Sequence, residues 1–394
     1  YFTITCEALG GWTEFTTQLR GLEAKYIEVP SVIHFGLGSG GWTAVMILTY
    51  MFALMGIQSS PAFTLWNFGL KSPKPLAWQQ VFMSTFVVGI ALFFFTAFQG
   101  MGARILQSMG EIAPQTDGDV VPMLMNYLLP GPLMAIVFLG IIAAIHSTAA
   151  PYIGTGGTIV LRDIYWRYVK KQEAGHAEQI WANRIFVTVI TLLAVIVSLT
   201  SPGAIVMIGG FATAFGFIMY LMLLGVHYGF KYPSIGAALG LVGAIIACFI
   251  TYFFYQYPLS MHTAFWGLFT GLVIAYLCRG LGIKDNEETI KRQAEMRQWI
   301  SDIDGPSEKG RKWRNAMKWV VPIWYLFAIG PFCILGNTAF EFGGFLPIWS
   351  WQIVWWIIGI VMMWALCFKA EMSTTSEEQI KRADLEQNIV VKEV

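Results

Sequence analysis

Apolar runs of about 20 residues, separated by short polar segments, recur along most of this chain. A helix of that length crosses a hydrocarbon core of roughly 30 Å. Because lipid offers no partners to free backbone groups, repeated runs of this kind predict an all-α, polytopic helical membrane protein. The pattern predicts about nine transmembrane helices, at residues 43–58, 77–98, 131–161, 182–200, 204–227, 233–256, 262–281, 317–337 and 347–368.

The remaining segments are polar and differ in character. Residues 1–42 read as an extracellular or periplasmic connector that does not span, and their opening TITCEALGG resembles the last turn of a helix. Since the chain begins with Tyr1 rather than Met, we expect it to be incomplete. Residues 284–316 form one long charged loop, expected to contain a surface helix and a turn at Gly305-Pro306. The tail, 370–394, is polar.

Composition supports the membrane class and narrows the function. The chain is 56% hydrophobic and 12% charged, against roughly 25% charged residues in soluble domains. Its five cysteines show no CxxC or metal-ligand spacing. The sequence also contains no nucleotide-binding loop and no nucleophile arrangement. These features argue against an enzyme, an organic cofactor and a nucleic-acid partner.

The basic residues predict the orientation. If residue 1 lies outside and the nine spans alternate, 22 of the 25 lysines and arginines fall on the inner side. Cytoplasmic loops carry such an excess. We therefore expect a multi-pass protein of the cell's inner or plasma membrane, with a cytoplasmic C-terminus. The third span exceeds what a bilayer requires, so its C-terminal end should project into the cytoplasm.

The third span also carries the strongest chemical signal. Ser147 and Thr148 lie where a lipid-buried helix should be apolar, and the Ala144 carbonyl lies one turn earlier. One interpretation is that both hydroxyls bond back to their own helix. The other is an oxygen site for a hard cation, which Pro151 favours because a proline frees carbonyls in the preceding turn. The glycines of GTGG, residues 154–157, would permit close helix packing.

His146 is the third polar residue at this place. An imidazole has an ordinary pKa of roughly 6.5 and could relay protons. It could equally be a neutral histidine that bonds to a neighbouring helix. The residues leave both readings open.

The first span contains a candidate helix break. Gly56, Gln58 and Pro61 cluster near one end of the apolar run, together with two serines. Proline removes a backbone donor and clashes with the preceding turn. A helix broken within a membrane lines a cavity or is buried in protein, and such breaks form substrate sites in transporters. A simple proline kink followed by a loop is the alternative.

These features together resemble the sodium:solute symporter family, over about residues 1–256. The first span with GIQSSP is similar to the family's broken substrate helix, and the GGW connector suits its outer loop. The residues that resemble the family's second signature region are Asp119 with Pro122, Pro130-Gly131, Ala143-Ala144, Ser147-Thr148 and Asp163-Ile164-Tyr165.

The resemblance implies a leucine-transporter-like fold built from two inverted repeats. Residues 43–227 would form the second repeat and residues 228–369 accessory helices. The first several helices would be missing, and their half of the protein would be a partner, in the same or a separate polypeptide. The resemblance further implies sodium on Ala144, Ser147 and Thr148. The substrate would lie against Met51, Leu54, Met55 and Gln58.

Two departures from the family matter. His146 stands where the family usually has an apolar residue, which raises the possibility of proton coupling. Met51, Leu54 and Met55 are apolar where sugar-transporting members are polar, so a carboxylate or an amino acid is favoured as the small organic solute. The expected function is sodium-coupled symport by alternating access, with Na+ as the coupling ion. The alternatives are a proton-coupled or sensor-type relative, and a non-transporting membrane scaffold.

Overall fold

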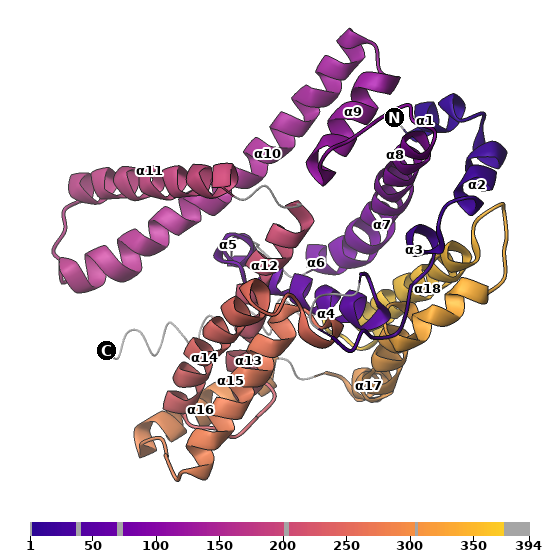
Figure 1. Ribbon diagram of the computed structural model, residues 1–394. Coiled ribbons are helices and arrows are strands. Elements are labelled where there is room, and N and C mark those ends of the chain that lie inside the picture. The colour runs from indigo at the N-terminus through magenta and orange to yellow at the C-terminus, as the bar shows by residue number, and fades with distance from the viewer. Residues whose placement is uncertain (1, 37–40, 69–73, 201–204, 304–305, 374–394) are drawn as a thin grey trace. The chain divides into compact units, whose positions relative to one another are not determined.

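The computed structural model describes residues 2–36, 41–68, 74–200, 205–303 and 306–373. Within these ranges every regular element is a helix, which confirms the predicted all-α class (Figure 1). The chain divides into two compact units. The first comprises Tyr1–Ile57, Leu70–Ser108 and Gly210–Val394, and the second comprises Gln58–Gly69 and Met109–Gly209.

Seven helices in the described ranges are long and apolar enough to cross a membrane. An eighth arises if Glu308–Ala328 and Pro331–Thr338, which are bent by 51° relative to each other, count as one span. The first predicted span corresponds to a shorter apolar helix, Ala44–Ser59. The chain is therefore a polytopic helical membrane protein, and the count of nine spans stays a prediction. The seven are Pro75–Ser108, Gly131–Val169, His176–Thr200, Ile208–Val226, Ser234–Phe253, Thr263–Gly280 and Pro347–Lys369.

The first unit holds most of the helices. The π-helical segments η2 (Gln79–Val87) and η3 (Ala91–Ala97) join α6, α7 and α8 into one long helix. The α-helices of this unit are α1 (Phe2–Ala8), α2 (Trp12–Arg20), α3 (Ala24–Ile27), α4 (Ala44–Leu54), α6 (Lys74–Trp78), α7 (Val88–Ile90), α8 (Phe98–Ser108), α13 (Tyr220–Val226), α14 (Ser234–Phe253), α15 (Thr263–Gly280), α16 (Glu287–Ile303), α17 (Glu308–Ala328) and α18 (Pro347–Trp364), with most of α12 (Ile205–Ile218). Shorter segments are η6 (Pro258–Ser260), η7 (Pro331–Thr338) and η8 (Ala365–Lys369).

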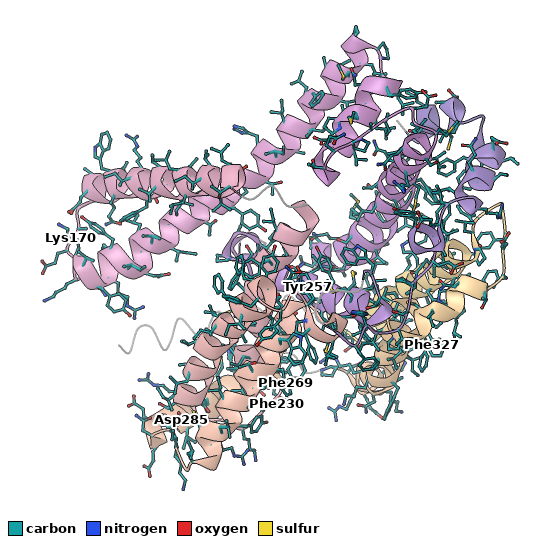
Figure 2. All side chains as sticks on the ribbon, viewed as in Figure 1. Lys170, Phe230, Tyr257, Phe269, Asp285 and Phe327 are labelled. Atoms are coloured by element: carbon teal, nitrogen blue, oxygen red, sulfur yellow. The ribbon has the colours of Figure 1, made fainter. Side chains whose placement is uncertain are left out.

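The second unit is built around one long helix. Its elements are α5 (Pro61–Phe68), η4 (Asp117–Asp119), α9 (Val120–Leu128), α10 (Gly131–Ile159), η5 (Val160–Val169) and α11 (His176–Thr200). Together α10 and η5 make a helix of 39 residues, which confirms that the third predicted span exceeds the length of a bilayer crossing. Side chains project from α10 and α11 on all sides (Figure 2).

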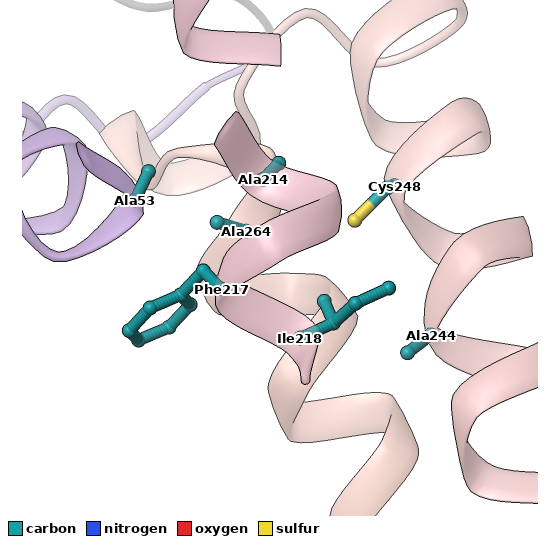
Figure 3. Close-up of a cluster of buried hydrophobic side chains, with 7 residues drawn as sticks. All are labelled: Ala53, Ala214, Phe217, Ile218, Ala244, Cys248 and Ala264. Atoms are coloured by element: carbon teal, nitrogen blue, oxygen red, sulfur yellow. The ribbon is translucent and has the colours of Figure 1, made fainter. Parts of the chain in front are cut away.

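Small side chains allow the core of the first unit to form (Figure 3). The buried cluster contains Ala53 of α4, Ala214 and Phe217 of α12, Ala244 and Cys248 of α14, and Ala264 of α15. All five cysteines are free and buried, as expected for small hydrophobic residues in apolar runs. The core thus fixes α4 against three other helices.

The polar segments agree in part with expectation. Residues 1–42 carry only short helices within the described ranges. The charged loop contains the expected surface helix, α16. Gly305 of the predicted turn lies outside the described residues. The next helix, α17, begins with the Ser307 side chain accepting a hydrogen bond from the Gly310 amide at 3.1 Å.

Candidate functional site

The two hydroxyls of α10 converge on one carbonyl. Ser147 Oγ donates to the Ala144 carbonyl at 2.9 Å, and Thr148 Oγ1 donates to the same oxygen at 3.0 Å. This is the back-bonded arrangement that membrane helices commonly show. It also brings three hard oxygen ligands together on one face of the helix. The sequence-predicted cation ligands therefore lie within reach of a single ion.

These three oxygens are exposed within the described part of the chain. All residues from Ile141 to Thr148 are exposed, and the neighbouring Ile142 and Ile145 are 58% and 61% exposed. A sodium ion prefers more oxygen ligands than three, as hard cations generally do. The geometry fits part of a sodium site, and the remaining ligands must come from other groups.

The prediction that Pro151, like Gly56 and Pro61, marks a helix break is not met, because Pro151 lies inside the continuous helix α10. The helix continues to Ile159, although proline has no N–H to donate to the Ser147 carbonyl. Two glycines further along pack against α11. A Cβ on Gly157 would lie 2.5 Å from Val187 Cγ2, and one on Gly156 would lie 3.3 Å from Ile190 Cδ1. The glycine-rich segment therefore brings α10 and α11 together, as predicted.

His146 projects from the same part of α10 and is exposed. Within the described residues it forms no hydrogen bond to a neighbouring helix. Within the described residues, the structure therefore gives His146 no partner that would support a proton relay or a bond to a neighbouring helix. Its role stays a prediction.

The candidate helix break is present. The helix α4 ends at Leu54, the 3-10 segment η1 (Met55–Ser59) follows, and α5 starts at Pro61. Proline suits the first turn of a helix because its missing N–H would have no partner there. A second helix, α5, begins at Pro61. The role of the break as a substrate site stays a prediction.

Gly56 of this break lies against α12. A Cβ on Gly56 would overlap the Thr213 carbonyl oxygen and the Phe217 amide. Reciprocally, a Cβ on Gly216 would overlap the Gly56 carbonyl oxygen. Backbones approach this closely only where both residues lack a side chain. The break is therefore held by backbone contact within the first unit.

The four predicted substrate residues differ in environment. Met51 is 41% exposed and Gln58 is exposed, whereas Leu54 is half-buried. Met55 packs with Phe52 against the core of Figure 3. Met55 therefore has a structural role, and Met51 is the apolar residue of this set most open to a ligand.

In the second unit α5 packs against α10. The rings of Phe63 and Tyr152 meet edge to face, with their centroids 6.2 Å apart. Thr64 Oγ1 donates to the Ser60 carbonyl at 3.1 Å and lies 3.4 Å from the Gln58 carbonyl oxygen. The helix that follows the break is therefore in contact with the helix that carries Ser147 and Thr148.

Sequence reasoning missed a buried histidine, His262. It is fully buried at the start of α15, where its Nδ1 accepts a hydrogen bond from the Ala264 amide at 3.3 Å. Its ring lies between Tyr50, edge to face at 5.1 Å, and Tyr257, stacked at 5.5 Å. Its backbone amide donates to Thr49 Oγ1 of α4 at 2.9 Å. His262 thus connects the broken helix to α15.

This cluster contains unsatisfied polar atoms. Within the described residues, His262 Nε2, Tyr257 Oη and Thr263 Oγ1 are buried without a hydrogen-bond partner. The preceding loop is strained, because Gln256, Tyr257 and Leu259 have positive φ. In the sequence, Pro258 was the only nearby residue that indicated an irregular loop before His262. Burial of His262 depends on residues more than 200 positions away, which periodicity does not reveal.

Comparison with known proteins assigns these features to a family. Residues 43–245 match the model of the sodium:solute symporter family. The sodium/glucose cotransporter of Vibrio parahaemolyticus is 26% identical over 216 residues. That alignment covers 50% of this chain and 37% of the cotransporter, so the chain spans well under two thirds of this relative. No solved structure matches the chain.

Proposed function

The chain belongs to the sodium:solute symporter family, and we propose that it forms part of a sodium-coupled secondary transporter of a small organic solute. Transport would proceed by alternating access, in which sodium binding favours one state and solute binding permits the change. The observation that carries the proposal is the convergence of Ser147, Thr148 and the Ala144 carbonyl on α10. It occurs inside the region that matches the family.

Sodium would replace the two back-bonding hydrogen bonds. The hydroxyl protons would turn away from the Ala144 carbonyl, and all three oxygens would then face the ion. The other ligands would come from an N-terminal half of the transporter, in the same or a separate polypeptide. Residues 43–227 would be the second inverted repeat of a leucine-transporter-like fold, and residues 228–369 would be accessory helices.

The solute would bind beside the helix break. Met51 and Gln58, the exposed members of the predicted substrate set, would contact it. The cotransporter of Vibrio parahaemolyticus is named for glucose. A sugar site needs polar partners for each hydroxyl, because a buried unpaired hydroxyl is costly. A small carboxylate or an amino acid has its polar groups at one end and leaves the rest apolar, so the apolar residues Met51 and Leu54 favour such a solute over a sugar.

The same proposal fixes the orientation. With residue 1 outside, the basic segment η5 and the charged helix α16 lie in the cytoplasm, as does the tail. The protein would reside in the cell's inner or plasma membrane.

Removing the two hydroxyls tests the sodium site. We expect the Ser147→Ala, Thr148→Ala double variant to need at least about tenfold more sodium for half-maximal uptake, since lost ligands weaken ion binding. Thr158→Ala is the matched control, because Thr158 Oγ1 bonds back to the Gly154 carbonyl at 2.9 Å on the same helix. Uptake of radiolabelled solute by the complete transporter in proteoliposomes measures both. Unchanged sodium dependence in the double variant would remove the proposal.

Proton coupling is the second candidate, and His146 motivates it. This exposed imidazole directly precedes Ser147 and forms no hydrogen bond within the described residues. If protons drive transport, His146→Gln should abolish uptake driven by a pH gradient, and wild-type uptake should persist without sodium. Sodium-driven uptake that ignores the pH gradient would exclude it. A non-transporting scaffold would show neither kind of uptake.

A further inference from the structure

A cavity of about 450 Å³ lies at one end of the first unit, where α13, the start of α14 and the charged helix α16 meet. Its location is defined by two membrane-length helices, since Ile208–Val226 ends there and Ser234–Phe253 begins there. Phe230, in the connection between them, and Asp285, just before α16, are labelled at this end in Figure 2. The cavity therefore sits at a membrane boundary, whichever side of the membrane that is.

One wall of the cavity is apolar. Met222 and Val226 come from α13, Phe230 from the connection, and Met296 from α16. Methionine side chains are flexible and adapt to ligands of irregular shape. Met222 and Val226 belong to the membrane-length helix Ile208–Val226, so an acyl chain could lie against them.

The helix α16 also brings positive charge to the cavity. Arg292 and Arg297 line the cavity, and its described lining residues include no carboxylate. Arg292 is already paired, since its Nη2 donates to Glu288 Oε1 at 2.5 Å. Arg297 forms no ion pair within the described residues, and its Nη2 donates to the Gly225 carbonyl at 3.2 Å. The Arg297 charge is thus uncompensated.

Arg297 also has unused hydrogen-bonding capacity. Its Nε is buried and has no hydrogen-bond partner within the described residues. A guanidinium presents several donors in a fixed fork that matches the oxygens of a phosphate. A half-buried guanidinium with a free Nε next to an apolar cavity is therefore suited to a phosphate carried on an apolar molecule.

Neutral donors complete the cavity. Ser234 and Gln293 line it, with Gln293 Nε2 lying 3.4 Å from Ser234 Oγ. The nearby carboxylate of Asp285 is engaged elsewhere, since it accepts hydrogen bonds from the Ser234 amide at 2.8 Å and from Gln293 Nε2 at 3.1 Å. Asp285 therefore orients Ser234 and Gln293 and does not occupy the cavity.

We infer that this cavity binds the phosphate headgroup of an anionic phospholipid. Basic pockets between membrane helices at a lipid–water boundary recognise such headgroups. The phosphate would bind Arg297, the glycerol hydroxyls would meet Ser234 and Gln293, and an acyl chain would lie against Met222 and Phe230. The site is independent of the sodium and solute sites proposed above.

Native mass spectrometry of the intact protein with phosphatidylglycerol, and with phosphatidylcholine for comparison, tests the site. We expect phosphatidylglycerol to bind preferentially and Arg297→Gln to weaken it by about tenfold, the effect of losing one charge-assisted hydrogen bond. Arg311→Gln, which removes an equal charge from an exposed position on α17, should change binding less than about twofold. Equal losses in both variants would mean diffuse electrostatic attraction and would overturn the inference.

Two further measurements distinguish a lipid site from a soluble phosphate site and from a folding defect. Glycerol phosphate, which lacks acyl chains, should compete only weakly; full competition would mean a soluble phosphate site and would overturn the lipid assignment. Because Arg297 also bonds to Gly225, its variant is checked by thermal unfolding. If that variant does not fold, photo-crosslinking of a diazirine-labelled phosphatidylglycerol to the wild-type protein decides. Labelling should map to peptides containing Met222 and Met296, and labelling elsewhere alone would overturn the inference.

Discussion

The helices of both pairs, α10–α11 and α14–α15, are apolar enough to cross a membrane, but the two pairs pack very differently. In the most apolar stretch of α15, a third of the residues are buried. In the most apolar stretch of Gly131–Val169, none is buried. Hydropathy therefore predicts that a helix enters a membrane but says little about what it contacts there.

Small residues explain the close packing of α14 and α15. Gly240 on α14 faces Gly271 on α15, whereas Gly236 lies against Ala275 and Gly267 lies against Ala244. Each helix has the GxxxG spacing that lets helix backbones approach. A Cβ on Gly240 would lie 2.5 Å from the Gly271 carbonyl oxygen. By contrast, Cβ atoms on Gly140 and Gly154 of α10 would meet no atom within 4 Å.

The loose pair is the one that carries polar groups. In α10 the glycines contact α11 only near Gly156 and Gly157, and α10 extends well beyond α11 (Figure 1). The Ser147 and Thr148 hydroxyls lie in the exposed part. A tightly packed scaffold and an exposed helix with polar groups are what alternating access would require, since one part moves against the other.

The largest loss of stability should come from a substitution that fills the close contact between the α14 and α15 backbones. Gly240→Val places a branched side chain against the Gly271 backbone and should destabilise the protein by about 3 kcal/mol. Gly140→Val makes the same chemical change on α10 and should alter stability by less than about 0.5 kcal/mol. A thiol-reactive dye measures both during heating, because all five cysteines are buried and free. Equal melting temperatures for the two variants would contradict the difference in packing between the two helical pairs.

The two histidines offer a second test. His262→Ala removes a fully buried ring and the acceptor for the Ala264 amide, so we expect about 2 kcal/mol of destabilisation. His146→Ala removes an exposed ring and should change stability by less than about 0.5 kcal/mol. The same unfolding assay compares them. A larger loss for His146 would mean that the middle of α10 is covered in solution.

Local rules predicted the features that depend on a few neighbouring residues. Pro61 and Gly56 located the helix break, because a missing N–H acts within one turn. Back-bonding of Ser147 and Thr148, one of the two interpretations open from the sequence, acts over the same short range. The length of the third span followed from the run of apolar residues.

Features that depend on distant residues were not predicted. Met55 was assigned to a substrate face, yet it packs on a core supplied by α12 and α14. His262 received no role, because Tyr50 and Thr49 lie more than 200 positions away. The GxxxG pairs were readable in the sequence, but which helix each would meet was not.

The smallest effect concerns a polar contact that adds to packing in the first unit. Beyond the end of η8, the Glu371 carboxylate accepts hydrogen bonds from the Ser307 hydroxyl at 2.6 Å and from the Ser307 amide at 2.7 Å. The Ser307 side-chain and backbone hydrogen bonds, with a smaller contribution from Arg314, hold the pKa of Glu371 below its ordinary value. Because the folded pKa is lowered, this contact stabilises the protein above the ordinary carboxyl pKa. The stabilisation is lost as pH falls through the folded pKa.

Glu371→Gln should therefore lower the melting temperature by less than about 2 °C at neutral pH, since exposed polar contacts contribute little. The difference from wild type should shrink as pH falls below the ordinary carboxyl pKa, roughly 4.3. Glu308→Gln is the control, because Glu308 forms only an exposed pair with Lys312 at 3.5 Å. If Glu371→Gln lowered the melting temperature as much as Gly240→Val, this polar contact, rather than close helix packing, would dominate the stability of the first unit.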